Sequence, residues 1–357
     1  MRRNRLVKLE TRPILTVLRR RRSVKPLGIL FVFVLFTPLT SLRSFAFAAL
    51  PARHQSGEGL SQSQRRNSGS TGGPDSLLQQ AKSFLQNGDL PSAERAARSY
   101  LQTHSNSADG HFLLGNILFR ETKPMDSLSE YTEAARYGDP TTFDLKVVAL
   151  DYVLLADYAD ADKWFSKSLQ GNSRDSQTWY YLGRTKYNES RLDEAIHAFR
   201  QCLDIDPKNV KAEDNLGLSY EGLGRSEEAL IAYRTAIGWQ ALSLDKTSGP
   251  LIDLGALLMK QNRAEEALAY LRQAVEISPA ESRAHEYLGK AYADMNRMEE
   301  AQRELEKAVA ITPQSARLHF ILGQIYRKEG LTKKAQIELE QASQLNGRHD
   351  LPRNPEP

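Results

Sequence analysis

Small residues recur along this chain every 34 residues, and that spacing limits the possible fold more than any other feature. One series consists of Ala81, Gly115, Ala149, Gly183, Gly217, Gly255, Gly289 and Gly323. A second series keeps the same register and consists of Ala93, Ser127, Ala161, Ala195, Ala229, Ala267, Ala301 and Ala335. Both series contain one longer step of 38 residues, and it falls at the same place. Self-similarity with a period of this length predicts a solenoid of stacked repeats.

Each repeat has the pattern of two amphipathic helices joined by a turn. In the unit at 176–207, apolar residues at helical spacing predict a first helix over 179–187 and a second over 195–205. Pro207 ends the second helix, because proline has no N–H to donate. Gly183 and Ala195 are small where we expect the two helices to cross. No alternating strand pattern is present, so the predicted fold class is all-α.

These residues resemble the tetratricopeptide repeat (TPR) family. The family pattern of Trp, Leu-Gly, Tyr, Ala, Phe, Ala and Pro stands here as Trp179, Leu182-Gly183, Tyr187 (one residue late), Ala195, Phe199, Cys202 and Pro207. Later units keep it, as in Leu216-Gly217, Tyr220, Ala229 and Tyr233, whereas the units at 74–107 and 142–175 are degenerate. The resemblance covers about eight units over residues 74–347. It implies a right-handed superhelical solenoid of antiparallel helix pairs.

The first 48 residues have the composition of an export signal. They hold eleven Lys or Arg and one acid, Glu10, which leaves 37 Lys or Arg and 43 Asp or Glu for the rest. An apolar run over 27–36 follows the basic cluster, and Ala46-Phe47-Ala48 offers small residues for cleavage after Ala48. The sequence therefore predicts a protein that is periplasmic or secreted after cleavage.

Anchoring in the inner membrane through residues 27–50 is the alternative for the same segment. The uncharged stretch from Pro26 to Leu42 is 17 residues long, which is marginal for a membrane span and favours cleavage. Either outcome places the repeats outside the cytoplasm. Residues 49–73 are rich in Ser and Gly and predict a disordered linker, and 348–357 predict a short disordered tail.

The sequence contains no pattern of residues that points to catalysis, a cofactor or a metal. The single cysteine, Cys202, excludes cysteine-rich zinc sites and is expected to be a buried packing residue. The seven histidines make no His-Glu-x-x-His pair. The acidic balance beyond residue 48 does not suggest a nucleic-acid binder. We therefore predict a protein that is not an enzyme and uses no cofactor.

The resemblance implies a binding groove, because first helices line the concave face of the superhelix in this family. The inward positions carry aromatic side chains interleaved with cations, which suits a protein or extended peptide with acidic groups. An ordinary solvated face is the alternative for any one of these positions. The predicted groove residues are Tyr180, Tyr181, Arg184, Tyr187, Lys211, Asn215, Arg283, Tyr287, Lys290, Arg317, Phe320 and Gln324.

One known ligand class of the family is not predicted. The family's clamp for chaperone C-terminal carboxylates needs a set of Lys, Asn and Arg residues on three consecutive first helices. This chain offers only Lys146 and Lys211, or only Asn215, depending on the register chosen.

The predicted function is a non-catalytic scaffold of the cell envelope or periplasm. Two alternatives stay open: a self-assembling subunit of a secretion or polysaccharide-export complex, and an enzyme with an unrecognised site. The 38-residue step is expected to let one second helix run on by a turn, with Trp239 covering the joint.

Overall fold

The described residues form sixteen α-helices and no strand. The computed structural model describes residues 74–241 and 243–349, so the predicted signal or anchor, the linker and residues 350–357 of the predicted tail lie outside the described residues. The helices are α1 (Pro74–Gln86), α2 (Leu90–Thr103), α3 (Ala108–Arg120), α4 (Pro124–Ala134), α5 (Thr142–Leu154), α6 (Tyr158–Gly171), α7 (Ser176–Asn188), α8 (Leu192–Ile205), α9 (Val210–Gly222), α10 (Ser226–Gln240), α11 (Gly249–Lys260), α12 (Ala264–Ile277), α13 (Ser282–Asp294), α14 (Met298–Ile311), α15 (Ala316–Lys328) and α16 (Thr332–His349).

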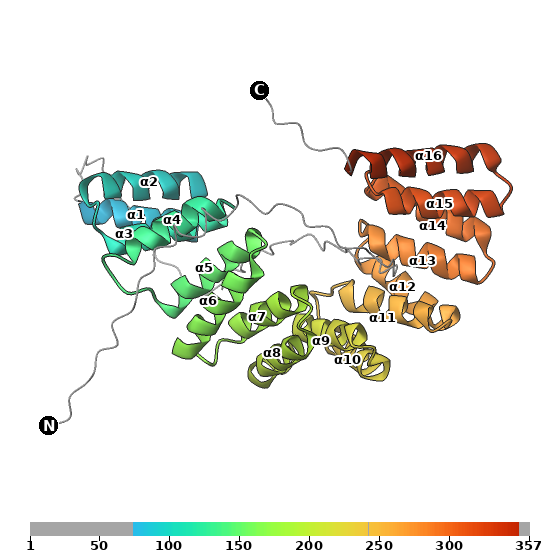
Figure 1. Ribbon diagram of the computed structural model, residues 1–357, viewed down its shortest axis with the longest axis horizontal. Coiled ribbons are helices and arrows are strands. Elements are labelled where there is room, and N and C mark those ends of the chain that lie inside the picture. The colour runs from blue at the N-terminus through green and yellow to red at the C-terminus, as the bar shows by residue number, and fades with distance from the viewer. Residues whose placement is uncertain (1–73, 242, 350–357) are drawn as a thin grey trace, which may run out of the picture. The chain divides into compact units, whose positions relative to one another are not determined.

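Consecutive helices pair into eight hairpins, from hairpin 1 (α1–α2) to hairpin 8 (α15–α16) (Figure 1). Each second helix also packs against the first helix of the next hairpin, and first helices of several neighbouring hairpins touch. The predicted all-α solenoid of antiparallel helix pairs is therefore confirmed. The last helix continues to His349, two residues into the stretch that the sequence assigned to a tail.

The small residues of the first series lie where the two helices of a hairpin meet. A Cβ atom added at Gly183 would lie 2.6 Å from the ring of Phe199, and one at Gly217 would lie 2.6 Å from the ring of Tyr233. Contacts this short would force the two helices apart. The same relation holds between Gly255 and Leu271. Close approach of the two helices, rather than backbone freedom, therefore explains these glycines.

The turn inside each hairpin uses a left-handed residue at one fixed place. The next residue's N–H donates to the carbonyl five positions earlier, at 2.8–2.9 Å, as in a Schellman turn. The φ angles of the left-handed residues lie between 55° and 78°. These residues are Gly88, Thr122, Ala156, Ser190, Gly224, Asn262, Asn296 and Gly330.

The 38-residue step is absorbed by a loop rather than by a helix. α10 has 15 residues and the equivalent α8 has 14, so the second helix runs on by one residue and the predicted extra turn is wrong. Gln240 instead anchors the following loop: its Nε2 donates to the Thr247 carbonyl at 2.9 Å and its Oε1 accepts from the Thr247 N–H at 3.0 Å. Trp239 is half-buried. Satisfying the loop's backbone groups in this way lets the stack continue into α11.

The hydrophobic core runs from hairpin to hairpin. One cluster of buried residues extends from Ala195 to Ala335, and smaller clusters lie around Leu114 and Leu128. Cys202 is fully buried in the largest cluster, where burial raises its pKa to about 12. The prediction that this cysteine is a packing residue is confirmed. A thiol in this position is an inert apolar group at neutral pH.

Candidate binding surface

The predicted groove residues lie on four first helices, and we call the surface that these helices share with α11 the first-helix face. α7 carries Tyr180, Tyr181, Arg184 and Tyr187, α9 carries Lys211 and Asn215, α13 carries Arg283, Tyr287 and Lys290, and α15 carries Arg317, Phe320 and Gln324. α11 lies between α9 and α13 in the stack and touches both. It contributes Asp253 and Met259 at equivalent positions.

The tyrosines on this face are partly core residues. Tyr180, Tyr187 and Tyr287 are half-buried and pack against the main hydrophobic cluster. The Tyr181 ring stacks on Phe165 with 6.1 Å between ring centroids, and the rings of Tyr180 and Tyr181 are 5.5 Å apart. Burial raises the pKa of both tyrosines. Sequence reasoning had assigned these rings to a partner, but much of their area contacts the protein's own core.

Three of the five predicted cations are paired with acids on the same face. Arg283 donates to Asp253 Oδ1 at 2.8 Å, joining α13 to α11. Glu286 Oε1 accepts from Lys290 at 2.6 Å and forms an ion pair with Arg317 at 2.7 Å, joining α15 to α13. Asp253 and Glu286 are each only 3% exposed. These cations therefore have intramolecular partners, which weakens the prediction that they are available to bind an acidic ligand.

The remaining predicted residues of the face differ in how accessible their side chains are to a partner. Asn215 is buried, and its Nδ2 donates to the Lys211 carbonyl at 2.7 Å, so one of its two N–H groups is already used on its own helix. Gln324 accepts a hydrogen bond from Arg327. Lys211 is exposed, and no acidic side chain within the described ranges forms an ion pair with it. Phe320 is 52% exposed and is the most open aromatic ring of the face.

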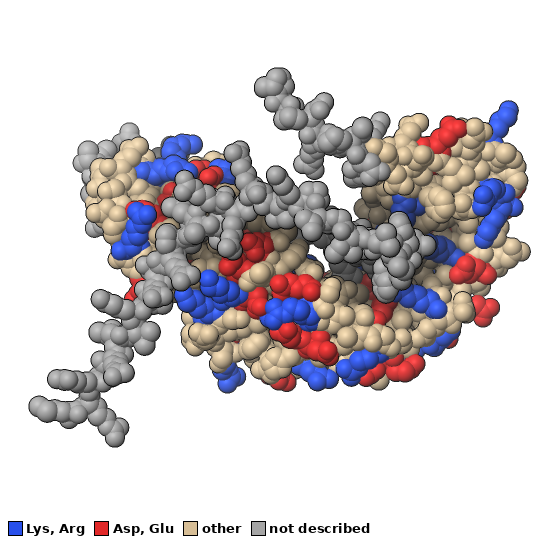
Figure 2. Space-filling view, viewed as in Figure 1, with Lys and Arg blue, Asp and Glu red and all other residues tan. Residues whose placement is uncertain are grey.

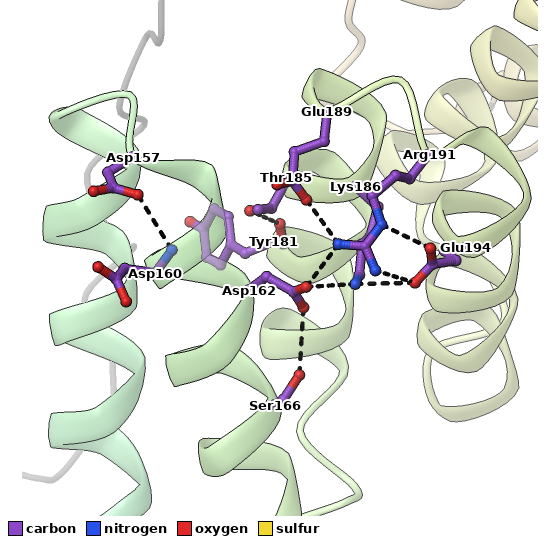
Figure 3. A network of polar contacts seen from close by, with 10 residues as sticks. All are labelled: Asp157, Asp160, Asp162, Ser166, Tyr181, Thr185, Lys186, Glu189, Arg191 and Glu194. Atoms are coloured by element: carbon purple, nitrogen blue, oxygen red, sulfur yellow. Dashed lines mark hydrogen bonds and ion pairs between the residues drawn. The ribbon is translucent and has the colours of Figure 1, made fainter. Parts of the chain in front are cut away.

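A buried cation that interrupts the apolar pattern organises a charged cluster between α6, α7 and α8 (Figure 3). Lys186 is 7% exposed, and its Nζ lies 2.6 Å from Asp162 and 3.0 Å from Glu194. Arg191 adds bonds to Asp162 at 2.9 Å and to Glu189 at 3.0 Å. Hydrogen bonds from Arg191 and Lys186 lower the pKa of Glu194 to about 2. The cluster satisfies its own charges, so it fixes the packing of three helices.

A buried carboxyl group lies between α4 and α5. Asp151 is 0% exposed, and its Oδ2 lies 2.6 Å from Ser127 Oγ, which lies 2.9 Å from the Gly115 carbonyl oxygen. A hydroxyl has one proton and can donate to only one of these oxygens. Both contacts are satisfied when a protonated Asp151 donates to Ser127 and Ser127 donates to Gly115. Burial raises the pKa of Asp151 to about 8, in agreement with a neutral group.

The histidines form a repeated structural contact. Nδ1 of His111, His285 and His319 lies 2.6 Å from a glutamate on the paired second helix, and Nε2 lies 2.9–3.0 Å from a backbone carbonyl just before the first helix. Among the described residues, no group of three or more His, Cys, Asp and Glu could hold a metal ion. The repeated geometry therefore ties the two helices of a hairpin together.

Two surface clefts were not predicted. One, of about 330 Å³, lies on the first helices of hairpins 1–3 and is lined by Lys82, Asp109, Phe112, Asn116 and Asp144 among others. Sequence reasoning named no groove residue here, and two of the three units, at 74–107 and 142–175, are degenerate. The other, of about 310 Å³, lies beside the irregular step and includes Ile237, Lys246 and Glu276.

The visible charge of the protein is mixed. Lys and Arg side chains alternate with Asp and Glu on the face in Figure 2, without a single basic stripe. No helix in the described part of the chain is long and apolar enough to cross a membrane.

Comparison with known families identifies the repeats. Four family models, each described as "Tetratricopeptide repeat", match the chain: one at 78–140, one at 176–209, one at 258–325, and one at both 214–241 and 316–349. Together they reach every hairpin except hairpin 3, which belongs to one of the two degenerate units.

Curated relatives are similar to parts of this chain. The anaphase-promoting complex subunit 3 of Schizosaccharomyces pombe is 24% identical over 200 residues, 56% of this chain and 29% of that protein. The peroxisomal targeting signal receptor of Saccharomyces cerevisiae is 30% identical over 98 residues, 28% of this chain and 16% of the receptor. The protein O-mannosyl-transferase TMTC3 of Mus musculus is 26% identical over 142 residues, 37% of this chain and 15% of the transferase. The chain thus spans less than a third of each relative.

Two solved structures share the fold. A tetratricopeptide repeat protein from Parabacteroides merdae matches with a TM-score of 0.57 and 18% identity, covering 76% of this chain and 98% of that one. The Cut9–Hcn1 hetero-tetramer of the APC/C matches with a TM-score of 0.55 and 15% identity, covering 76% of this chain and 53% of that one.

Proposed function

Because the chain belongs to the tetratricopeptide repeat family, we propose that it is a non-catalytic scaffold that binds a protein or an extended peptide on its first-helix face. The observation that carries the proposal is the pairing of Arg283 with Asp253 and of Arg317 with Glu286. These pairs lock three first helices into a fixed row, while Phe320 and Lys211 remain exposed on the same face. A pre-ordered surface loses less entropy when it binds a partner.

The names of two relatives support a binding role. One is a receptor for a targeting signal and another is a subunit of a complex. A third relative is named a transferase, but this chain matches only 15% of its length. His285 with Glu304 and Lys186 with Asp162 form structural contacts between packed helices rather than lining an open site. These contacts favour a scaffold over an enzyme.

Export from the cytoplasm is part of the proposal and rests on the sequence alone. The basic cluster, the apolar run and the small residues before Ala48 support cleavage. Expression of the full chain in a bacterial host, followed by fractionation and mass measurement, tests this point. A soluble product beginning near residue 49 is expected. A full-length product in the membrane fraction would favour the anchor, and a full-length soluble product in the cytoplasm would refute export.

Self-assembly is a second candidate, and two exposed side chains favour it. Ile231 on α10 is 64% exposed and Ile337 on α16 is 63% exposed, at the same position of their repeats. Apolar side chains repeated on one side of a solenoid suit contact with another copy. Molar mass measured by light scattering over a hundredfold range of concentration tests this. A constant monomer mass would exclude it.

The partner-binding proposal can be tested by affinity capture. The mature protein is compared with a variant in which Lys211, Phe320 and Gln324 are changed to alanine, since these side chains are not part of the hydrophobic core. A matched control variant changes Ile231 and Ile337 to alanine on the second helices. A protein retained by the wild type and the control, but lost from the triple variant, would support the first-helix face. Equal retention by all three would refute it.

A further inference from the structure

The irregular step leaves a cleft beside the second helices α10 and α12. Its lining comes from the last turns of these two helices, from the start of α11 and from the loop between α10 and α11. That loop runs from Ala241 to Ser248, whereas the loop between α8 and α9 runs only from Asp206 to Asn209. None of the predicted groove residues lines this cleft. It is therefore a surface separate from the candidate binding surface.

The floor of the cleft is apolar and only partly covered. Ile237 on α10 and Ile277 on α12 are half-buried, and Leu251 on α11 is 1% exposed. All three belong to one cluster of the hydrophobic core. The volume of about 310 Å³ is close to the lower end for ligand pockets, about 300 Å³. The cleft therefore has room for an apolar side chain supplied from outside.

The loop beside the cleft holds a leucine out in water. Leu244 is completely exposed, more than any other large apolar side chain in the described ranges. The backbone on both sides of it is fixed: the Ser243 N–H donates to the Gln240 carbonyl at 3.0 Å, and the Asp245 N–H donates to Ser243 Oγ at 3.1 Å. Gln240 also holds Thr247 through two hydrogen bonds. An apolar side chain on an anchored loop loses little entropy when a partner buries it.

Opposite charges line the same cleft. Lys246 comes from the loop and Glu276 from α12, both are exposed, and neither forms an ion pair with another described residue. One small surface thus carries an exposed leucine and an apolar cleft, together with a lysine and a glutamate. Each of these features has its match on a second copy of the same surface. A self-complementary patch is what a two-fold contact between identical chains requires.

We propose that two copies of the chain associate through this surface, each inserting its Leu244 into the cleft of the other. Lys246 of each copy then lies opposite Glu276 of the other. A two-fold contact of this kind closes at the dimer and does not continue into a fibre. The patch is small, so the dimer is reversible. The contact uses no residue of the first-helix face and neither Ile231 nor Ile337, so it is independent of the surfaces proposed above.

Sedimentation equilibrium tests the dimer. The protein purified from expression of the full chain is measured from micromolar to several hundred micromolar concentration. The mass should rise reversibly to that of two chains and no further. A mass of one chain at every concentration would overturn the proposal, and a mass beyond two chains would overturn its closed two-fold form.

Substitutions on the surface assign the contact to Leu244. Leu244→Ala should raise the dissociation constant of the dimer about a hundredfold, because it removes buried apolar atoms at two symmetry-related places. Leu244→Asp should leave only monomer. The matched control changes Ile231 and Ile337, which are also exposed on second-helix hairpin elements, to alanine and should keep the wild-type constant. Thermal melting of each variant checks that the fold is intact.

Charge reversal tests the pairing between the copies. Lys246→Glu and Glu276→Lys should each raise the dissociation constant about tenfold, because like charges then face each other twice. The double variant should recover most of the affinity. A short bis-maleimide added to a mixture of Lys246→Cys and Glu276→Cys proteins should join position 246 of one chain to position 276 of the other. The native Cys202 is buried and does not compete.

The outcomes separate this contact from the other surfaces. A dimer that Leu244→Asp leaves unchanged would overturn the proposed contact. A dimer lost in the Ile231 and Ile337 variant, but kept in Leu244→Asp, would assign self-association to α10 and α16 instead. Failure of the double charge reversal to restore affinity would refute the pairing of Lys246 with Glu276. The partner on the first-helix face is tested separately by affinity capture.

Discussion

Changing Asp151 to asparagine should remove a pH dependence from the stability of the protein. The carboxyl is fully buried and bonds only to Ser127 within the described residues, and its pKa rises from 3.8 to about 8. Between these values the unfolded chain releases a proton that the folded chain keeps. The unfolded state then binds fewer protons, so the free energy of unfolding falls as pH rises.

The size of the effect follows from the pKa difference. Each pH unit in the window costs about 1.4 kcal/mol, so the loss is about 4 kcal/mol by pH 7 and about 6 kcal/mol well above pH 8. Asparagine keeps a donor for Ser127 Oγ and carries no charge at any pH. The variant and the wild type should therefore be equally stable near pH 4, and the variant should become progressively more stable up to pH 8.

Urea unfolding at half-unit steps from pH 4 to pH 9 measures this difference. Trp164 is a suitable fluorescent probe, because it packs against the core cluster of α4 and α5. Hydrogen exchange of α3–α5 should accompany it, since repeat arrays can unfold in parts. Asp193→Asn, on the exposed surface of α8, is the control and should follow the wild type. Parallel stability curves for Asp151→Asn and wild type would show that Asp151 ionises like an ordinary aspartate.

Three further results are expected. Gly217→Leu should destabilise the protein by about 3 kcal/mol, because even its Cβ atom would lie 2.6 Å from the Tyr233 ring. Gly238→Leu is the control and should not lower the melting temperature, because a Cβ atom added there has no neighbour within 4 Å. Asp162→Ala should lower the free energy of unfolding by about 2 kcal/mol, because the buried Lys186 loses a partner at 2.6 Å. Lys186→Met should change the free energy of unfolding by less than about 1 kcal/mol, because it removes the buried charge itself. Equal losses for the two variants in thermal melts would contradict this. Cys202 should not react with a thiol reagent at pH 8 until denaturant is added, because burial raises its pKa to about 12, and labelling of the native protein would refute that.

The architecture could be predicted from the sequence, because the repeated small residues mark contacts between residues that are close together in the chain. Gly183 and Gly217 mark helix crossings, and each crossing involves residues only 16 positions apart, Phe199 and Tyr233. A spacing that repeats eight times therefore predicts the hairpins and their stacking. The loop after Gln240 was misjudged because its hydrogen bonds to Thr247 depend on one side chain, which a periodic pattern does not contain.

The binding surface was only partly predictable for a different reason. Helical spacing correctly placed Arg283 and Lys290 on a first helix, but it gave no information on whether their charges were free. The answer depends on how far a side chain extends between helices about 30 residues apart, as from Arg283 to Asp253. It also depends on how deeply a ring such as Tyr180 is buried. The individual groove residues therefore remain predictions until a partner is bound.

The left-handed turns give the array an uneven resistance to proteolysis. Hairpins 1, 5 and 8 have glycine at the left-handed position and hairpins 6 and 7 have asparagine, and both residue types tolerate a positive φ angle. The three consecutive turns of hairpins 2, 3 and 4 have Thr122, Ala156 and Ser190 there, which are strained in this conformation. Each of those residues carries about 1 kcal/mol of strain that is released when its turn opens. A protease that samples transient openings should thus cut first between α3 and α8, in the interior of the array rather than at its ends. A partner bound on the first-helix face would slow that cut, which makes limited digestion a direct reporter of occupancy.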